Sequence, residues 1–190
     1  MKGIIFSVVE ETICAEYGVQ VWDDLLTTAG LPGGYSTLGD YPDEELYQLI
    51  AVGSHALQTS PEALTRHLGT ASLKALSGKY PEFMVPHTNT RDFMLTLNDV
   101  IHPEVRKLHP HANPPEFEFS DDSNGDLLVG YRSARRLCAF ADGMIVGAAG
   151  HFGQSVVVQH DMCTSRGDES CLLRCTFSPR AETGLADVAH

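Results

Sequence analysis

The chain has 190 residues, of which 43% are hydrophobic and 20% charged, and this length and composition suit one domain with its own apolar core. Its 13 basic and 25 acidic residues give a formal net charge of −12, which argues against nucleic acid or an anionic membrane as a partner, because both attract clustered positive charge. Five cysteines, an odd number, and nine histidines favour metal binding over a disulfide framework.

The start of the chain carries no targeting pattern. Its apolar run after Lys2 is shorter than the core of a signal peptide and is followed by Glu10 and Glu11. No segment approaches the roughly 20 apolar residues that span a bilayer. We therefore expect a cytoplasmic protein without a membrane segment, in which clustered thiols bind metal or take part in redox chemistry.

The first half of the chain predicts helices. Apolar residues at helical spacing indicate helices over 8–17 and 21–26, whereas the glycines and proline of 30–39 indicate a loop. Acidic residues at 43–45 favour the start of a third helix. Ser60 followed by Pro61 is typical of a helix N-terminus and predicts a helix from Pro61 to about Ser77.

A further helical pattern runs from Arg91 to Leu108, but Pro103 lies inside it. Proline removes a backbone donor and crowds the preceding turn. The helix should therefore kink or restart near His102.

The second half of the chain predicts a sheet and one more helix. After a Pro114-Pro115 connector, the pattern indicates strands near 117–119 and over 127–131, a helix over 138–150, and paired strands over 154–160 and 171–177. Residues 178–190 lack apolar content and predict a frayed tail. The fold class is therefore α+β, with one domain over 1–177 that is helical over 1–110 and sheet-rich over 111–177.

Three cysteines and one histidine in the second half form a candidate zinc site. Zinc prefers four tetrahedral thiolate and imidazole ligands, and the predicted elements allow convergence of Cys138, His160, Cys163 and Cys171. Such a site, with all four positions filled by protein, would be structural. Cys175 lies on the same predicted strand face as Cys171 and could replace a ligand or form a disulfide on oxidation. The alternative is a set of unconnected buried thiols.

Two other patterns are candidates for ligand binding. His102 follows the apolar pair Val100-Ile101, and a pocket-facing imidazole can bind haem iron, although a hydrogen-bonded core histidine has the same pattern. Strand alternation would point Tyr131, Ser133 and Arg135 to one face, where two hydroxyls and a guanidinium could receive a carboxylate. The alternative for this trio is a solvated strand face.

These motifs, together with the opening residues Met1 to Phe6, resemble the haem nitric oxide/oxygen-binding (H-NOX) family, a sensory domain related to the haem portion of soluble guanylate cyclase. The resemblance runs from Met1 to about Phe177. It implies a haem b enclosed between the helices and the sheet, with His102 binding the iron. It also implies that Tyr131, Ser133 and Arg135 grip the propionates and that Pro115 presses on the porphyrin. The implied apolar pocket residues are Ile5, Val9, Leu76 and Met144.

The resemblance also implies which gas is bound. Oxygen-binding members carry a distal tyrosine where this chain has Phe140, which offers no donor to bound oxygen. We therefore expect a sensor that binds nitric oxide and carbon monoxide and excludes oxygen. Bacterial members with a similar Cys/His set carry zinc, which supports the four ligands above. His109 stands where relatives often have tyrosine, and we expect it and His111 to be solvated.

The implied output is a conformational signal to a separate protein. Nitric oxide binding opposite His102 would shift the helix that carries it, and the family resemblance indicates a histidine kinase or a cyclic-di-GMP enzyme as the partner. Oxidation at the thiols, with Cys175 as an accessory, would be a second input. The rival classes are a haem-free, zinc-stabilised module for another small molecule and an enzyme. We do not expect an enzyme, because the distal side lacks an acid–base pair and a four-ligand zinc leaves no position for water.

Overall fold

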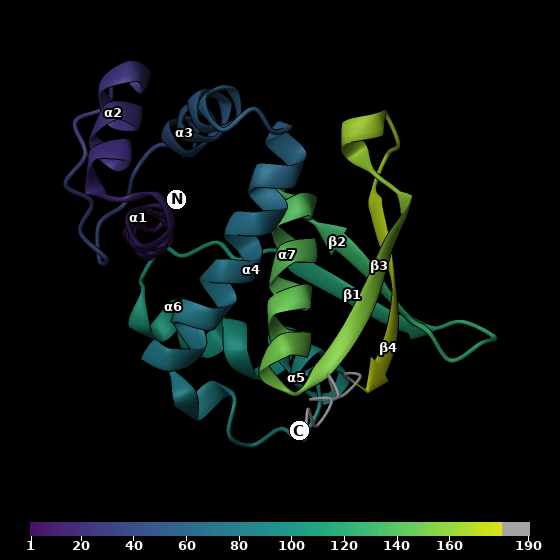
Figure 1. Cartoon of the computed structure of the whole chain (residues 1–190). Helices are drawn as coiled ribbons and strands as arrows, with labels where there is room; N and C mark the ends of the chain where they lie inside the picture. Colours follow the sequence, from purple (N-terminus) through teal and green to yellow (C-terminus); the bar gives the residue numbers. More distant parts are fainter. Residues whose placement is uncertain (180–190) are drawn as a thin grey trace, which may run out of the picture.

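Seven α-helices and one four-stranded antiparallel sheet make up residues 1–179, the part of the chain that the computed structural model describes (Figure 1). Helices come first and the sheet second, with one long helix inserted between its strands. The predicted α+β class is therefore confirmed. Within the described residues, the helices lack the combination of length and apolar character that a membrane span needs.

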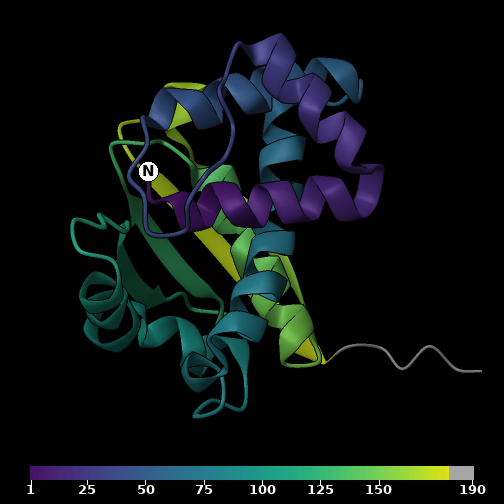
Figure 2. The same cartoon turned by 90° about the vertical axis from the view of Figure 1, so that its left-hand side faces the viewer.

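The first four helices are α1 (Gly3–Tyr17), α2 (Val19–Ala29), α3 (Asp43–Ala56) and α4 (Pro61–Lys79). Figure 2 shows α1, α2 and α3 gathered on one side of the molecule, away from α5 and α6. Their shared core includes Phe6, Trp22 and Leu46, all buried. At the start of α4 the Ser60 hydroxyl accepts a hydrogen bond from the Ala63 amide at 3.0 Å, so the predicted helix N-terminus is confirmed.

The segment around His102 forms α5 (Thr90–Leu95), a π-helical turn (Leu97–Ile101) and α6 (His102–Leu108). A helix does restart at His102, as Pro103 predicts, because the second position of a helix needs no amide donor. The π-turn was not predicted. Its wider winding is visible in the hydrogen bond from the Ile101 amide to the Thr96 carbonyl, five residues back, at 3.1 Å.

The sheet has the strand order β1-β2-β4-β3, from β1 (Glu116–Asp121), β2 (Leu127–Arg132), β3 (Gln154–Met162) and β4 (Cys171–Pro179). The register places Tyr131 of β2 opposite Phe117 on one side and Cys171 on the other. Strand β4 continues to Pro179, so the tail predicted from Ser178 starts too early. Residues 180–190 of that predicted tail lie outside the described residues.

Helix α7 (Cys138–His151) connects β2 to β3 and packs between the sheet and α4 (Figure 1). Glycines allow the two helices to touch backbone to backbone. A Cβ atom at Gly143 would lie 1.9 Å from the Arg66 carbonyl oxygen, and one at Gly69 would lie 2.2 Å from that of Phe140. This close packing fixes the position of α7 relative to α4.

Candidate functional site

A mostly apolar cavity of about 260 Å³ lies between the helices and the sheet. Its walls come from α1, α4, α5, α6 and α7, from β1 and β2, and from the connector before β1. Eight of the predicted site residues line it: Ile5, His102, Pro115, Tyr131, Ser133, Arg135, Phe140 and Met144. The structure thus brings together residues from both halves of the chain.

His102 is the half-buried first residue of α6 and forms part of the cavity wall. Burial lowers its pKa to about 4, the positive charge of Arg106 acts in the same direction, and the backbone of Pro115 opposes both through a hydrogen bond. Its ring lies 5.8 Å from that of Phe117, centroid to centroid. His102 is therefore a neutral imidazole near pH 7, the form that can donate a nitrogen lone pair to a metal.

The predicted strand face of Tyr131, Ser133 and Arg135 is wrong in its local geometry. Strand β2 ends at Arg132, so only Tyr131 lies on it, while Ser133 and Arg135 belong to the turn that follows. The three nevertheless line the same cavity. Burial raises the pKa of the Tyr131 hydroxyl, and the neighbouring Ser133 side chain opposes this shift.

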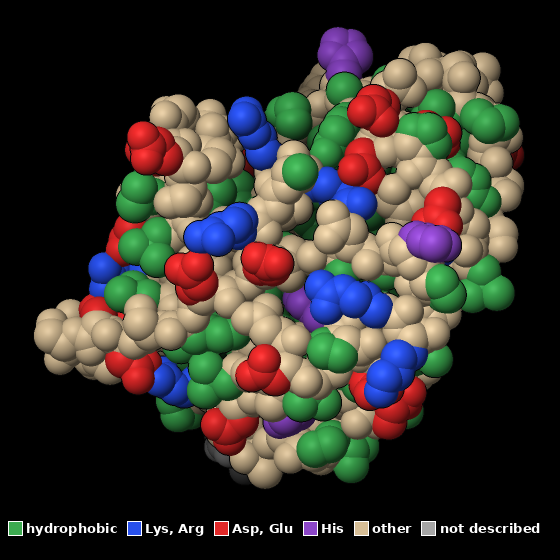
Figure 3. All heavy atoms as spheres, turned by 180° about the vertical axis from the view of Figure 1, so that it is seen from behind, with side chains coloured by type: hydrophobic (Ala, Val, Ile, Leu, Met, Phe, Trp, Pro, Cys, Tyr) green, Lys and Arg blue, Asp and Glu red, His purple; other side chains and the backbone are tan. Residues whose placement is uncertain are grey.

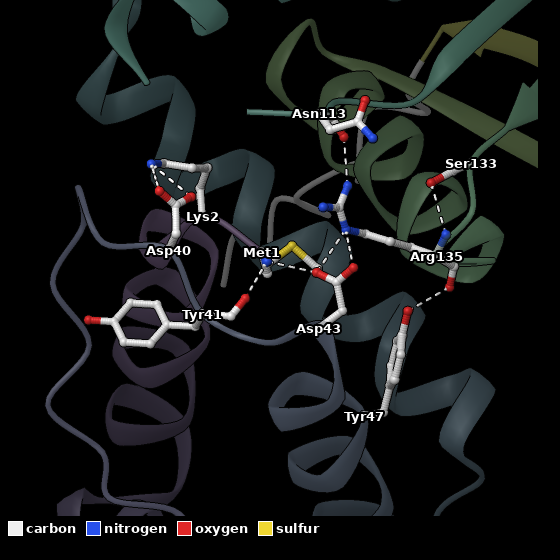
Figure 4. Close-up of polar contacts among 9 residues, drawn as sticks. All are labelled: Met1, Lys2, Asp40, Tyr41, Asp43, Tyr47, Asn113, Ser133 and Arg135. Carbon is white, nitrogen blue, oxygen red and sulfur yellow. Dashed lines mark hydrogen bonds and ion pairs between the residues drawn. The ribbon is translucent and has the colours of Figure 1, made fainter. Parts of the chain in front are cut away.

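Arg135 already has a carboxylate partner that sequence reasoning missed. Its Nε lies 3.0 Å from Oδ1 of Asp43, at the start of α3, and its Nη1 donates to the Asn113 carbonyl at 2.6 Å (Figure 4). The Met1 ammonium group contacts the same Asp43 carboxylate at 2.7 Å. A guanidinium has five N–H groups, so Arg135 keeps donors for a further anion.

Two of the predicted pocket residues lie away from the cavity wall. Val9 is buried in the core that α1 shares with α2 and α3, and Leu76 is half-buried elsewhere on α4. Leu73, one turn earlier on α4, lines the cavity in place of Leu76. Sequence reasoning also missed lining residues whose apolar spacing was visible in the predicted helices: Phe93, Met94, Leu97, Val105 and Ile145.

Three of the predicted zinc ligands converge at the N-terminal end of α7, which begins at Cys138. The sulfur atoms of Cys138, Cys163 and Cys171 lie within 4.8 Å of one another, and Cys138 Sγ is 3.3 Å from Cys163 Sγ. All three residues are buried. Burial alone would raise the pKa of Cys163, but its hydrogen bond with Ser165 and the adjacent His160 side chain lower it to about 6. The cluster therefore contains a thiol that ionises readily.

His160 lies beside this cluster. Its Nε2 is 3.0 Å from Oδ2 of Asp142, while its Nδ1 is buried and has no hydrogen-bond partner among residues 1–179. Sequence reasoning missed Asp142, although it is the one charged residue in the predicted helix over 138–150 and follows Cys138 by one turn. Three thiols and an imidazole nitrogen without a partner match the donor set that zinc prefers.

Cys175 lies on the buried face of β4 with Cys171, as predicted, whereas His109 is not solvated as the sequence predicted. Cys175 is 0% exposed in the core beneath α7, and burial raises its pKa to about 12, which opposes an accessory redox role. His109 is 6% exposed rather than solvated, with its Nε2 3.4 Å from the Tyr80 hydroxyl. His111 is exposed, as expected.

Known proteins resemble this chain in sequence and in fold. The family model for Haem-NO-binding matches residues 2–160. An H-NOX protein from S. oneidensis, solved in the Fe(II)NO ligation state, is 29% identical and superposes with a TM-score of 0.88 over 94% of this chain and 99% of that one. An H-NOX protein from K. algicida, 22% identical, shares the fold with a TM-score of 0.84 over 97% of this chain and 100% of that one.

A longer relative matches over one of its parts. The soluble guanylate cyclase gcy-31 of Caenorhabditis elegans is 26% identical over 172 residues, which are 85% of this chain and 24% of that protein. The chain thus spans about a quarter of this relative. The family match over residues 2–160 shows that the chain belongs to the Haem-NO-binding (H-NOX) family, a family of haem-based gas sensors, and the cavity with its neutral histidine agrees with this assignment.

Proposed function

We propose that this protein is a nitric oxide sensor that holds haem b in the cavity through His102. The observation that carries the proposal is a neutral imidazole on the wall of an apolar cavity whose rim carries Tyr131, Ser133 and Arg135. These residues fit a macrocycle that is apolar, has a metal at its centre and carries carboxylates at its edge. Bound haem would supply a ferrous iron that binds diatomic gases.

His102→Gly tests the assignment of the iron ligand. The full chain, expressed with ample iron, should contain about one haem b by a haemochrome assay, and its ferrous absorption spectrum should change on addition of nitric oxide. The His102→Gly variant should bind less haem, with an altered ferrous spectrum that added imidazole restores. Unchanged haem content and spectrum in this variant would refute His102 as the ligand. Absence of haem from the wild-type protein would favour a zinc-stabilised module for another small molecule.

The apolar wall supports selectivity for nitric oxide and carbon monoxide. Ile5, Phe140 and Met144 line the cavity on α1 and α7, and none of these side chains has a hydrogen-bond donor. Bound oxygen carries partial negative charge and needs a donor, whereas nitric oxide does not. The ferrous protein should therefore fail to form a stable oxygen complex in air.

We further propose that Cys138, His160, Cys163 and Cys171 hold a structural zinc ion. Two observations support this proposal. The three sulfur atoms lie close together, and the buried Nδ1 of His160 has no hydrogen-bond partner among the described residues. With four protein ligands the ion would be closed to water and would stabilise the junction of α7 with β3 and β4. Metal analysis of the purified chain should find about one zinc per molecule.

The proposed output is a shift of α6 that a separate histidine kinase or cyclic-di-GMP enzyme detects. His102 is the first residue of α6, and the π-turn separates α6 from α5. A displacement of the His102 ring would therefore act directly on α6. Acidic and basic side chains are intermingled on the face shown in Figure 3. The net charge of −12 favours a partner with a basic contact surface. Phosphotransfer or cyclic-di-GMP turnover, measured with and without nitric oxide, would identify the partner.

The cysteines support a cytoplasmic location. All five are free thiols in the structure, and reduced cysteines are typical of that compartment. A fusion to a reporter that works only in the cytoplasm would test this location.

A further inference from the structure

We infer that Asp142 is the positioning residue of the metal centre, because it fixes the ring of His160 so that Nδ1 faces the thiols. This inference rests on the zinc site proposed above. Asp142 follows Cys138 by one turn of α7 and is 5% exposed. A buried carboxylate is costly unless its oxygens are paired, so its partners indicate why it is there.

The first carboxylate oxygen determines which nitrogen of His160 is free. Oδ2 of Asp142 lies 3.0 Å from Nε2 of His160. An ionised carboxylate only accepts hydrogen bonds, so Nε2 carries a proton, and Nδ1 is the nitrogen that can offer a lone pair to a metal ion. Nδ1 is buried without a partner among the described residues, and the side chain of His160 adjoins Cys163. The lone pair is thus directed to the sulfur cluster, where a metal ion would satisfy it.

The second carboxylate oxygen keeps Asp142 from rotating. Oδ1 accepts a hydrogen bond from Nε of Arg66 on α4 at 2.9 Å. Next to this pair the backbones of α4 and α7 are in contact, since a Cβ atom at Gly143 would overlap the Arg66 carbonyl. Each oxygen therefore has its own partner on a rigid element, and the carboxylate cannot turn without losing one of them.

A purely structural role would require only the ion pair. Asp142 and Arg66 alone would join α7 to α4, and the contact with His160 would then be incidental. The buried Nδ1 without a partner speaks against this reading, because burying an unsatisfied polar atom is unfavourable unless another group completes its bonding. The two readings predict different behaviour for two substitutions of the same residue.

The zinc affinity of the full chain, measured by competition with a chromophoric chelator, distinguishes the positioning role of Asp142 from a purely structural one. Asp142→Ala should weaken zinc binding about 10- to 100-fold, the usual effect of losing such an outer partner. Asp142→Asn should stay within roughly 3-fold of wild type, because its amide oxygen still accepts from Nε2 while the charge that pairs with Arg66 is gone. The matched control is Asp161→Ala, which removes an acid next to His160 on β3 that pairs with Arg174 instead. This control should bind zinc as wild type does.

The visible spectrum of bound Co²⁺ distinguishes a change in the orientation of the His160 ring from a loss of protein stability. Wild-type protein loaded with Co²⁺ should show the visible bands of a tetrahedral site with three sulfurs and one nitrogen, and these should shift in Asp142→Ala but not in Asp161→Ala. If Asp142→Ala does not fold, Asp142→Asn and Arg66→Ala decide the matter, and both should retain the wild-type bands.

Two outcomes would overturn the inference, and they differ in meaning. Wild-type zinc affinity and cobalt bands in a folded Asp142→Ala variant, or a loss of zinc affinity of about 10-fold or more in both Asp142→Asn and Arg66→Ala, would make Asp142 only the partner of Arg66 and leave the zinc site intact. A wild-type chain that takes up neither metal would refute the zinc site itself and the inference with it.

Discussion

Asp43 forms an ion pair with Arg135, which lines the cavity, and Arg135 Nε lies 2.9 Å from Asp43 Oδ2 (Figure 4). Asp43 begins α3 in the N-terminal group of helices, and Arg135 belongs to the turn after β2. The pair therefore joins the two halves of the fold at the position where the proposed haem carboxylates would lie. In the proposed holoprotein Arg135 would both stabilise the fold and bind a haem carboxylate, and a substitution of Asp43 can separate these two roles.

Asp43→Asn should weaken the fold while it leaves Arg135 free to bind an added carboxylate. The side chains of both partners are mostly buried, so loss of the pair should lower the free energy of unfolding by about 1 kcal/mol, near the upper end for pairs that water still reaches. Urea unfolding of the haem-free chain at pH 7 would measure this loss. Lys107→Ala, which removes an exposed pair with Glu104, is the control and should have a smaller effect.

The same carboxylate predicts how stability depends on pH. Burial alone would raise the pKa of Asp43, but hydrogen bonds from the Met1 ammonium and Arg135 hold it below its ordinary value of 3.8. Since the folded-state pKa is the lower one, this stabilisation is complete above 3.8 and is lost as the pH falls through the folded-state value. The gap in unfolding free energy between wild type and Asp43→Asn should narrow from pH 5 to pH 3. A constant gap over this range would contradict the assignment.

Phe140→Tyr should allow the ferrous protein to bind oxygen. Phe140 lines the cavity, and a hydroxyl at its para position would place a donor inside it. A hydrogen bond to a partly charged acceptor contributes about 1.5–3 kcal/mol, roughly a 10- to 150-fold gain in oxygen affinity. Absorption spectra in air would measure the effect. Phe140→Leu should behave as wild type. An oxygen complex in that control would mean that cavity size, rather than a hydrogen-bond donor, determines whether oxygen binds.

Local rules predicted the parts of the site that neighbouring residues determine. A proline inside a helical pattern kinks or restarts the helix, so the start of α6 at His102 could be predicted from Pro103. Cys163 and Cys171 flank one turn and were expected to meet for that reason. The family resemblance implied Leu76 for the pocket, but Leu73, three residues earlier on α4, lines the cavity instead.

The remaining parts of the site depend on contacts between residues that are far apart in the sequence. Asp43 and Arg135 are 92 positions apart, and Asp142 meets Arg66 across 76, so no local pattern connects them. Ser133 and Arg135 left the predicted strand because β2 ends at Arg132, where the chain turns towards α7. The π-turn before His102 depends on hydrogen bonds that helical periodicity does not encode.

Gly143→Ala should destabilise the protein because α4 leaves no space for a methyl group. The added Cβ would lie 1.9 Å from the Arg66 carbonyl oxygen and 2.9 Å from the Thr70 amide nitrogen, both backbone atoms. Such overpacking costs about 1–3 kcal/mol, which thermal or urea unfolding would detect. Gly150→Ala on the same helix is the control. Its Cβ would meet nothing within 4 Å, so the better helix propensity of alanine should leave stability unchanged or raise it by up to about 1 kcal/mol.

Cys163→Ser and Cys175→Ser should differ sharply in zinc content. Cys163 lies in the sulfur cluster, and its pKa of about 6 makes it a ready thiolate, so serine should reduce bound zinc to a small fraction of the wild-type amount. Cys175 is fully buried with a pKa of about 12, and serine there should lower stability but leave the zinc content unchanged. Metal analysis of the purified variants measures both. Loss of zinc from Cys175→Ser, with Cys163→Ser retaining it, would exchange the two assignments and restore Cys175 as a ligand.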